Sequence, residues 1–298
     1  MPRFAQGGEL MTPIFLAAAL ATALNASTPT AVIADPPADR AQPAAMEAFV
    51  LPSHGSGMNA VLYLASGARP HPTLLLLHGF PGNEQNLDLA QAARRAGWNV
   101  LTFHYRGSWG SGGDFSFLGA AEDTHAALAF LEDPANDARY RIDPKRVAVA
   151  GHSMGGYMAA DAAADDPRVV GLFLIDPWNI AADARTLGTP QGRKGWHDDA
   201  VGDLPPLSGT SEQKLADEMQ ANVDRFDLTK RTIRFGRRPV DIIGAQRGRG
   251  AAQTRLLNAV RGAGNARATG AVWPTDHPFS DMRIALASEL VRWLAQFQ

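Results

Sequence analysis

Short, uninterrupted apolar runs recur along this chain, and stretches with helical spacing lie between them. The clearest runs, 73–77, 146–150 and 169–175, are bounded by turn residues, which is typical of strands buried on both faces of a parallel sheet. We expect further strands at 46–51, 58–64, 98–105, 240–243 and 271–273, and helices at 83–96, 120–131, 154–164 and 281–298. This alternation predicts an α/β fold with a mostly parallel central sheet flanked by helices.

The composition of the chain excludes several classes of partner and of catalytic site. The 298 residues carry 28 basic and 30 acidic side chains, a net charge of −2, which argues against a nucleic-acid partner. The chain has no cysteine, so disulfides, thiolate zinc sites and cysteine nucleophiles are excluded. Length alone suggests about two domains, but α/β folds of this size often form one unit.

The N-terminal segment differs from the rest of the chain. Residues 14–24 form a mostly apolar run of the length of a secretory signal, too short for a membrane span. Small-residue cleavage sites follow at 21–23 and 32–34. We therefore expect a signal peptide within 1–34 and a linker at 35–45, with a disordered alanine-rich tail as the alternative. The mature protein is then periplasmic or secreted, without stable membrane insertion.

One long segment interrupts the alternation. Residues 177–238 contain no clear buried strand, and an amphipathic helix is expected at 211–226, capped by Thr210 with Gln213. We expect a lid or cap insertion above the sheet. The alternative is a surface addition packed to one side.

A glycine-rich turn joins the run 146–150 to the following helix. Its sequence, Gly-His-Ser-Met-Gly over 151–155, has the G-x-S-x-G pattern of a nucleophile elbow, in which Ser153 is the nucleophile. Small residues are needed on both sides of the serine because the turn is tight. The backbone N–H of Met154, at the helix N-terminus, can then stabilise an oxyanion. The alternative is a serine that only caps the helix.

With this elbow, the chain from 46 to 298 resembles an α/β-hydrolase. The sequence His-Gly-Phe-Pro-Gly at 78–82 directly follows a predicted strand, as H-G-x-P does in that family. The resemblance implies that the Phe80 N–H is the second oxyanion donor. It also implies a catalytic histidine shortly after the last strand, which is the place of His277.

The acid of the implied triad is missing from its usual place. The loop 244–250, after the penultimate strand, contains no carboxylate. Asp176 follows the preceding strand, where some family members carry the acid, and we favour it. Asp241 lies within a strand and Asp276 adjoins His277, so both are less suitable. A serine–histidine dyad without an acid is the remaining possibility.

The segment 104–113 is similar to the Y-R-G-S-x-G-x-G loop of prolyl-oligopeptidase-like and dienelactone-hydrolase-like proteins. This similarity makes Tyr105 and Arg106 candidate substrate contacts, although Arg106 can instead be buried and bonded locally. Trp178 is a candidate wall of the pocket, or a residue that only packs the lid.

These motifs together predict a serine hydrolase that cleaves a carboxylic ester through an acyl-enzyme. The substrate would be a small-molecule ester or a short peptide. A small peptidase or aminopeptidase, an acyltransferase, and a catalytically silent binding protein with this fold remain as alternatives. No metal or nucleotide cofactor is expected, since the glycine-rich segment 107–113 lacks both the P-loop and the G-x-G-x-x-G pattern.

Overall fold

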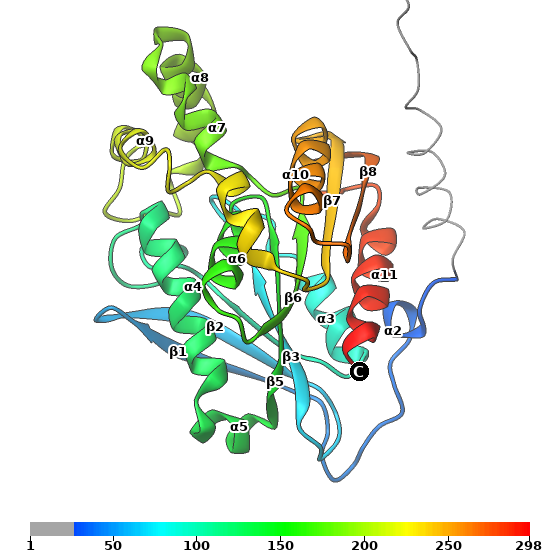
Figure 1. The fold of residues 1–298 in the computed structure, drawn as a ribbon. Helices are drawn as coiled ribbons and strands as arrows, with labels where there is room; N and C mark the ends of the chain where they lie inside the picture. Colours follow the sequence, from blue (N-terminus) through cyan, green and yellow to red (C-terminus); the bar gives the residue numbers. More distant parts are fainter. Residues whose placement is uncertain (1–26) are drawn as a thin grey trace, which may run out of the picture.

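The computed structural model describes residues 27–298 and contains one eight-stranded sheet (Figure 1). The strand order is β1-β2-β4-β3-β5-β6-β7-β8. The first two strands pair antiparallel with each other and β2 pairs antiparallel with β4, whereas all later pairs are parallel. The bounds are β1 (Ala45–Ser53), β2 (Ser56–Leu64), β3 (His71–Leu77), β4 (Asn99–Phe103), β5 (Ile142–His152), β6 (Val169–Ile175), β7 (Val240–Arg247) and β8 (Ala268–Asp276). The predicted α/β fold is confirmed.

Helices cover both faces of the sheet. Their bounds are α2 (Thr30–Ile33), α3 (Leu87–Arg95), α4 (Phe117–Glu132), α5 (Pro134–Tyr140), α6 (Met154–Asp165), α7 (Ile180–Ala184), α8 (Pro190–Ala200), α9 (Glu212–Ala221), α10 (Gly250–Gly262) and α11 (Arg283–Leu294), with short 3-10 helices at η1 (Thr186–Gly188), η2 (Val201–Asp203), η3 (Leu228–Phe235) and η4 (Ala295–Phe297). Buried residues of α4, α6 and α10 belong to one core cluster, and those of α3 and α11 belong to the other. The two clusters explain why the central strands are apolar on both faces.

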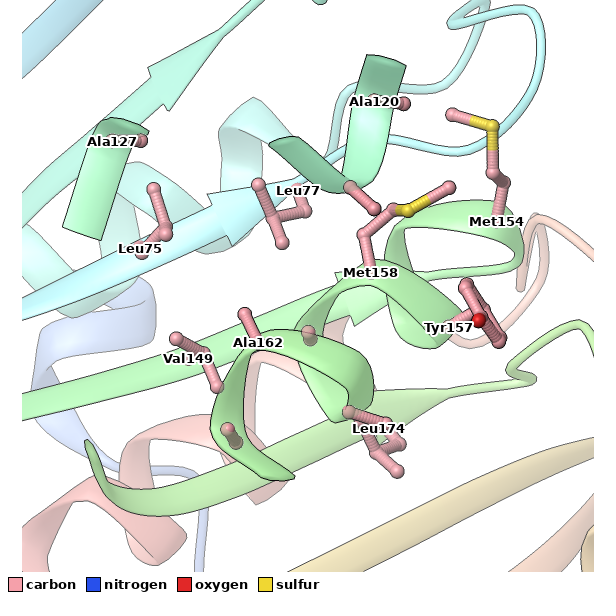
Figure 2. Packing of buried hydrophobic residues seen from close by; sticks show 14 of the residues in the cluster. Leu75, Leu77, Ala120, Ala127, Val149, Met154, Tyr157, Met158, Ala162 and Leu174 are labelled. Carbon is pink, nitrogen blue, oxygen red and sulfur yellow. The ribbon is translucent and has the colours of Figure 1, made fainter. Parts of the chain in front are cut away.

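Figure 2 shows the larger core between the sheet and α4 and α6. Leu75 and Leu77 of β3 and Val149 of β5 face Met158 of α6 and Ala120 of α4. All five side chains are at most 1% exposed. Burial of apolar surface contributes roughly 25 cal/mol per Å², so these side chains supply most of the free energy that holds α6 against the strands. This packing holds the N-terminal end of α6 directly above the end of β5.

The segment 177–238 contains α7, α8 and α9, which project above α6 beyond the carboxyl ends of the strands, and η3, which packs against α6 and leads to the start of β7 (Figure 1). The predicted cap of its amphipathic helix is off by one residue. Ser211, not Thr210, is the N-cap of α9, and its hydroxyl accepts the N–H of Lys214. The helix also ends at Ala221, earlier than predicted, because a separate turn carries the chain to the end of the predicted range.

A second helix of this segment was not predicted. Residues 190–200 are polar and contain two glycines, yet they form α8. Pro190 occupies the first turn and the Thr189 hydroxyl accepts the N–H of Gly192, so this helix begins with a proper cap.

Most of the predicted signal peptide, residues 1–26, lies outside the described residues. The end of that range is described: α2 contacts α3 and α11. Arg95 of α3 donates hydrogen bonds to the carbonyls of Ala31 at 2.5 Å and Val32 at 3.3 Å. Across residues 27–298, no helix combines the length and the hydropathy that a membrane span requires.

Candidate active site

Ser153 lies in a strained turn between β5 and α6. Its φ of 54° and ψ of −118° fall in a region that residues other than glycine rarely adopt. A Cβ at position 151 would lie 2.1 Å from the Gly155 carbonyl oxygen, and one at position 155 would lie 2.3 Å from that of Leu77. The two glycines are therefore required for the turn, as the nucleophile-elbow interpretation predicts.

The end of β6 is tied to this turn. Ser153 N–H donates to the Ile175 carbonyl at 3.0 Å, and Trp178 N–H donates to the Ser153 carbonyl at 2.8 Å. Asp176 lies between them with a φ of 41° and is fully buried. The backbone thus places Asp176 beside the elbow and directs the chain away from the sheet.

The Asp176 carboxylate contacts the side chain of His277. Its Oδ2 lies 2.6 Å from Nδ1 of the imidazole and accepts the backbone N–H of Arg249 at 2.9 Å, and its Oδ1 accepts the backbone N–H of Ala245 at 3.1 Å. Burial raises the pKa of the Asp176 carboxyl, but these three hydrogen bonds outweigh burial and hold the pKa below its usual value. The carboxylate is therefore ionised and keeps the proton of neutral His277 on Nδ1, which leaves Nε2 able to accept a proton.

The loop without a carboxylate, 244–250, has a structural role at this site. It supplies the two backbone N–H groups that Asp176 accepts, and Gly248 leaves room for the carboxylate. A Cβ at position 248 would lie 2.4 Å from Asp176 Oδ2 and 3.2 Å from the Cα of His277. The loop thus holds an acid that comes from the neighbouring strand.

The other two candidate acids lie elsewhere. Asp241 is 3% exposed within β7, where it accepts a hydrogen bond from the hydroxyl of Thr269 at 2.9 Å. Asp276 accepts the backbone N–H of Ser280 at 2.7 Å and caps the turn after β8. Neither has a hydrogen bond to His277 among the described contacts, so Asp176 is the carboxylate that the structure brings to the imidazole.

The loop of residues 78–82 passes against the elbow. A Cβ at Gly79 would lie 3.1 Å from the Cβ of Ser153, so the chain that carries the Phe80 N–H is next to the serine. His78 is buried, with Nδ1 2.7 Å from the Gly79 carbonyl. Burial lowers the pKa of His78 to about 4, so the ring is neutral and donates this hydrogen bond.

Tyr105 and Arg106 do not reach the cavity at Ser153, and the prediction that they contact substrate is corrected. Tyr105 is fully buried, and its hydroxyl donates to the His78 carbonyl at 3.2 Å. Arg106 pairs with Asp123 at 2.6 Å and with Glu122 at 2.5 Å, which is the locally bonded alternative. Tyr105 instead supports the loop of residues 78–82, and Arg106 ties its own loop to α4.

A cavity of about 440 Å³ lies over the antiparallel edge of the sheet, whereas a larger one of about 850 Å³ opens at Ser153 and His277. The larger cavity lies between the elbow and the helical segment 177–238. Its walls include three aromatic rings, which belong to Phe80, Trp178 and Trp196. We consider it the substrate site because it alone of the two contains the serine and the histidine.

The aromatic wall is held by specific contacts. The rings of Trp178 and Trp196 are stacked at 6.4 Å with an interplanar angle of 20°, and the ring of Trp196 lies 6.2 Å from that of Phe80. Trp178 Nε1 donates to Asp183 at 2.6 Å, and the Arg249 guanidinium lies 5.2 Å from the Trp178 ring centroid. The cavity therefore combines an aromatic wall with a polar and charged lining, which includes Asp183, Asp199, Asp203 and Arg249.

Comparisons with known proteins agree with this geometry. The model of the alpha/beta hydrolase family matches residues 74–296. The chain belongs to the alpha/beta hydrolase family. Its fold resembles an esterase from Pyrobaculum calidifontis, with a TM-score of 0.63 and 18% identity over 86% of this chain and 87% of that one. It also resembles the ferulic-acid complex of Est1E from Butyrivibrio proteoclasticus, with a TM-score of 0.65 and 16% identity over 84% and 98%.

Two relatives by sequence have names that give no activity. An uncharacterized Mycobacterium tuberculosis protein is 28% identical over 156 residues, 52% of this chain and 53% of its own. An uncharacterized 31.7 kDa Escherichia coli protein from the traX-finO intergenic region is 32% identical over 115 residues, 38% and 40% of the two chains. The chain thus spans about half the length of these relatives or less.

Two residues that contact the site in this alpha/beta hydrolase were not predicted to do so. Trp196 lies in α8, whose polar sequence gave no apolar stripe, and only its aromatic character was a signal. Arg249 lies in the loop 244–250, whose sequence is notable only for its lack of a carboxylate. Its N–H binds Asp176 while its side chain lines the cavity.

One group of side chains in residues 27–298 has metal-ligand spacing. Atoms of His125, Asp161 and Asp165 lie within 4.8 Å of one another. Both carboxylates are paired with arginines, however: Asp161 with Arg225 and Asp165 with Arg234. None of the three lines the cavity at Ser153, so the group has no part in that site.

Proposed function

We propose that this alpha/beta hydrolase cleaves a carboxylic ester by a serine mechanism, with Ser153 as nucleophile, His277 as general base and Asp176 as the acid of the triad. One observation carries the proposal. The buried Asp176 carboxylate engages Nδ1 of His277 at 2.6 Å at the edge of the cavity that contains Ser153. A silent binding protein needs neither this pair nor the strained turn that presents the serine.

The reaction follows from these positions. Nε2 of His277 accepts the Ser153 proton as the Oγ bonds to the ester carbonyl carbon. The resulting imidazolium is stabilised by Asp176 and passes the proton to the departing alkoxide as the ester C–O bond breaks. Water then attacks the carbonyl carbon of the acyl-enzyme as His277 takes a proton from the water. His277 returns this proton to Ser153 Oγ as the acyl–serine bond breaks, and the carboxylic acid product leaves.

Two backbone N–H groups are proposed to stabilise the oxyanion. Met154 N–H is the first of α6, so it has no acceptor within its own helix, and the helix N-terminus favours negative charge. Phe80 N–H is carried by the loop of residues 78–82, in which a Cβ at Gly79 would lie 3.1 Å from the Cβ of Ser153. Loss of one such donor costs about a hundredfold to a thousandfold in rate in other serine hydrolases.

Small esters with an apolar or aromatic group fit the cavity. Its volume of about 850 Å³ lies within the range of small-molecule sites, and its aromatic wall adjoins the serine. An ester also asks less of the site than an amide, because an alkoxide leaves without carefully timed protonation. We therefore propose a small-molecule ester, with short peptide amides as poorer substrates.

The test is hydrolysis of a panel of p-nitrophenyl and aryl esters by the wild-type protein and by Ser153→Ala. The variant is expected to keep its fold and to lose at least about a thousandfold in kcat/KM. Ser288→Ala is the matched control, because Ser288 is also buried but bonds only within α11. Equal ester turnover by Ser153→Ala and wild type would refute the proposal.

We also propose export, with cleavage after Ala23. Cleavage at the later site, after Ala34, would remove the two carbonyls of α2 that accept hydrogen bonds from Arg95. N-terminal sequencing of the periplasmic or secreted protein is expected to begin at Leu24. A mature N-terminus at Asp35, or a cytoplasmic protein that retains Met1, would contradict this proposal.

A further inference from the structure

His152 directly precedes Ser153 but does not line the cavity. It is the last residue of β5, where it pairs with Ile175 of β6, and it is 5% exposed. A Cβ at Gly79 would lie 3.3 Å from its Nδ1, so the ring lies beneath the loop of residues 78–82. The imidazole therefore occupies the space enclosed by the elbow and by the loop that carries His277.

The ring of His152 contacts His277 in two ways. Its Nε2 lies 3.0 Å from the His277 backbone carbonyl, and the two ring centroids are 4.5 Å apart. A carbonyl oxygen only accepts, so Nε2 of His152 carries the hydrogen and donates it. Burial, and then the neighbouring His277, lower the pKa of His152 to about 3, so the ring is neutral under ordinary conditions.

The neutral ring leaves one polar atom without a partner. Nδ1 of His152 is buried and has no hydrogen-bond partner among the described residues. A buried acceptor in that state costs roughly 1–3 kcal/mol, a cost that an apolar side chain of similar volume would avoid. Fold stability alone would therefore favour an apolar residue at position 152. The presence of a histidine there requires another explanation, which the Nε2 donor supplies.

The Nε2 donor helps to fix the position of His277. The loop after β8 carries this residue, and its side chain is 34% exposed, so close packing does not fix it. Asp176 holds the ring at Nδ1, whereas His152 holds the backbone carbonyl of the same residue. Two anchors on different elements fix the orientation of the imidazole, and catalytic geometry tolerates errors of only about 0.5 Å.

We infer that His152 is a positioning residue, whose Nε2–H holds the His277 backbone so that the catalytic imidazole stays aligned with Ser153. This inference rests on the proposed function. A neutral ring suits the role, because a cation at position 152 would oppose the positive charge that His277 acquires during the reaction. His152 does not line the cavity and acts through His277, so its effect is on turnover rather than on binding.

Three substitutions separate the donor from the shape of the side chain. The amide nitrogen of His152→Gln reaches about as far as Nε2, that of His152→Asn reaches only as far as Nδ1, and His152→Leu has no donor. We expect Leu and Asn to lower kcat for an ester at least about tenfold with KM within twofold. We expect Gln to remain within about threefold of the wild-type kcat.

Thermal unfolding of the same variants separates positioning from a structural role. His152→Leu is expected to unfold close to the wild-type temperature while it slows turnover, because it removes the unpaired buried nitrogen together with the donor to the His277 carbonyl. Equal kcat for Leu and wild type, equal loss for Leu and Gln, or a rate loss that follows a loss of stability would overturn the inference. Ser153→Ala is measured in parallel: if it remains active, the proposed function fails, and if only the His152 variants disagree, this inference alone fails.

Discussion

Replacement of Asp241 by asparagine is expected to stabilise the fold at alkaline pH without a change in catalysis. Asp241 is 3% exposed in β7, and its carboxyl has one side-chain donor, the hydroxyl of Thr269. Burial, followed by the negative charge of Glu289, raises its pKa from 3.8 to about 7. The ionised carboxylate is thus poorly compensated in the folded protein.

The size of the effect follows from this pKa. A shift of about three units corresponds to about 4 kcal/mol, at 1.36 kcal/mol for each unit. Between about pH 4 and pH 7 the folded state keeps a proton that the unfolded chain has lost, so stability falls as the pH rises through this window. Asparagine does not ionise, so the variant avoids the penalty, which reaches its full size above pH 7.

Urea unfolding of the wild-type protein and Asp241→Asn at pH 5 and pH 8.5 measures this difference. The variant's advantage in free energy of unfolding is expected to grow by about 2–3 kcal/mol between the two pH values. Ester hydrolysis should be equal in the two proteins, since Asp241 lies away from His277. An advantage that does not change with pH, or a variant that is less stable at pH 8.5, would refute the reasoning.

Three further substitutions test the site. Asp176→Asn should lower kcat by about a hundredfold to ten-thousandfold with the fold retained, because it removes the charge that sets the His277 tautomer; a loss below tenfold would contradict the triad. Gly248→Ala should lower kcat at least about tenfold, since its Cβ would lie 2.4 Å from Asp176 Oδ2, whereas Gly262→Ala, in open space, should have no effect. Trp196→Ala should raise KM for aryl esters about tenfold, and an unchanged KM would remove this ring from the substrate wall.

Regular elements with strong local signals could be predicted from the sequence. The bounds 169–175 were predicted as β6 has them, because an apolar run buried on both faces has few other solutions. The elbow was equally clear, since the two glycines flank Ser153 in a G-x-S-x-G pattern that directly follows an apolar run. In both cases the information is local in the chain.

Features that depend on distant partners could not be predicted in the same way. The helix α8 has no apolar stripe, and its single tryptophan, Trp196, is half-buried through contacts with the distant rings of Phe80 and Trp178. The side chain of Arg106 is occupied by Asp123 from α4, a partner 17 residues away that the loop motif does not reveal. Substrate contacts were therefore predicted at Tyr105, Arg106 and Trp178, whereas Trp196 of the helical segment was missed.

The position of Asp176 could be predicted from the sequence only in part. The order of strands places the ends of β6 and β7 side by side, so an acid after β6 was a reasonable prediction. Gly248 and the backbone donors of 244–250, which make the position workable, became visible only in three dimensions. The absence of a carboxylate in that loop leaves room for the one that comes from β6.

Labelling by a fluorophosphonate tests the central claim most directly, because the probe reacts with a serine that a neighbouring base has activated. The account predicts rapid labelling of the wild-type protein, a modified peptide that contains Ser153, and loss of labelling in both Ser153→Ala and His277→Ala. A folded wild-type protein that does not label, or a label on a different serine, would contradict the account.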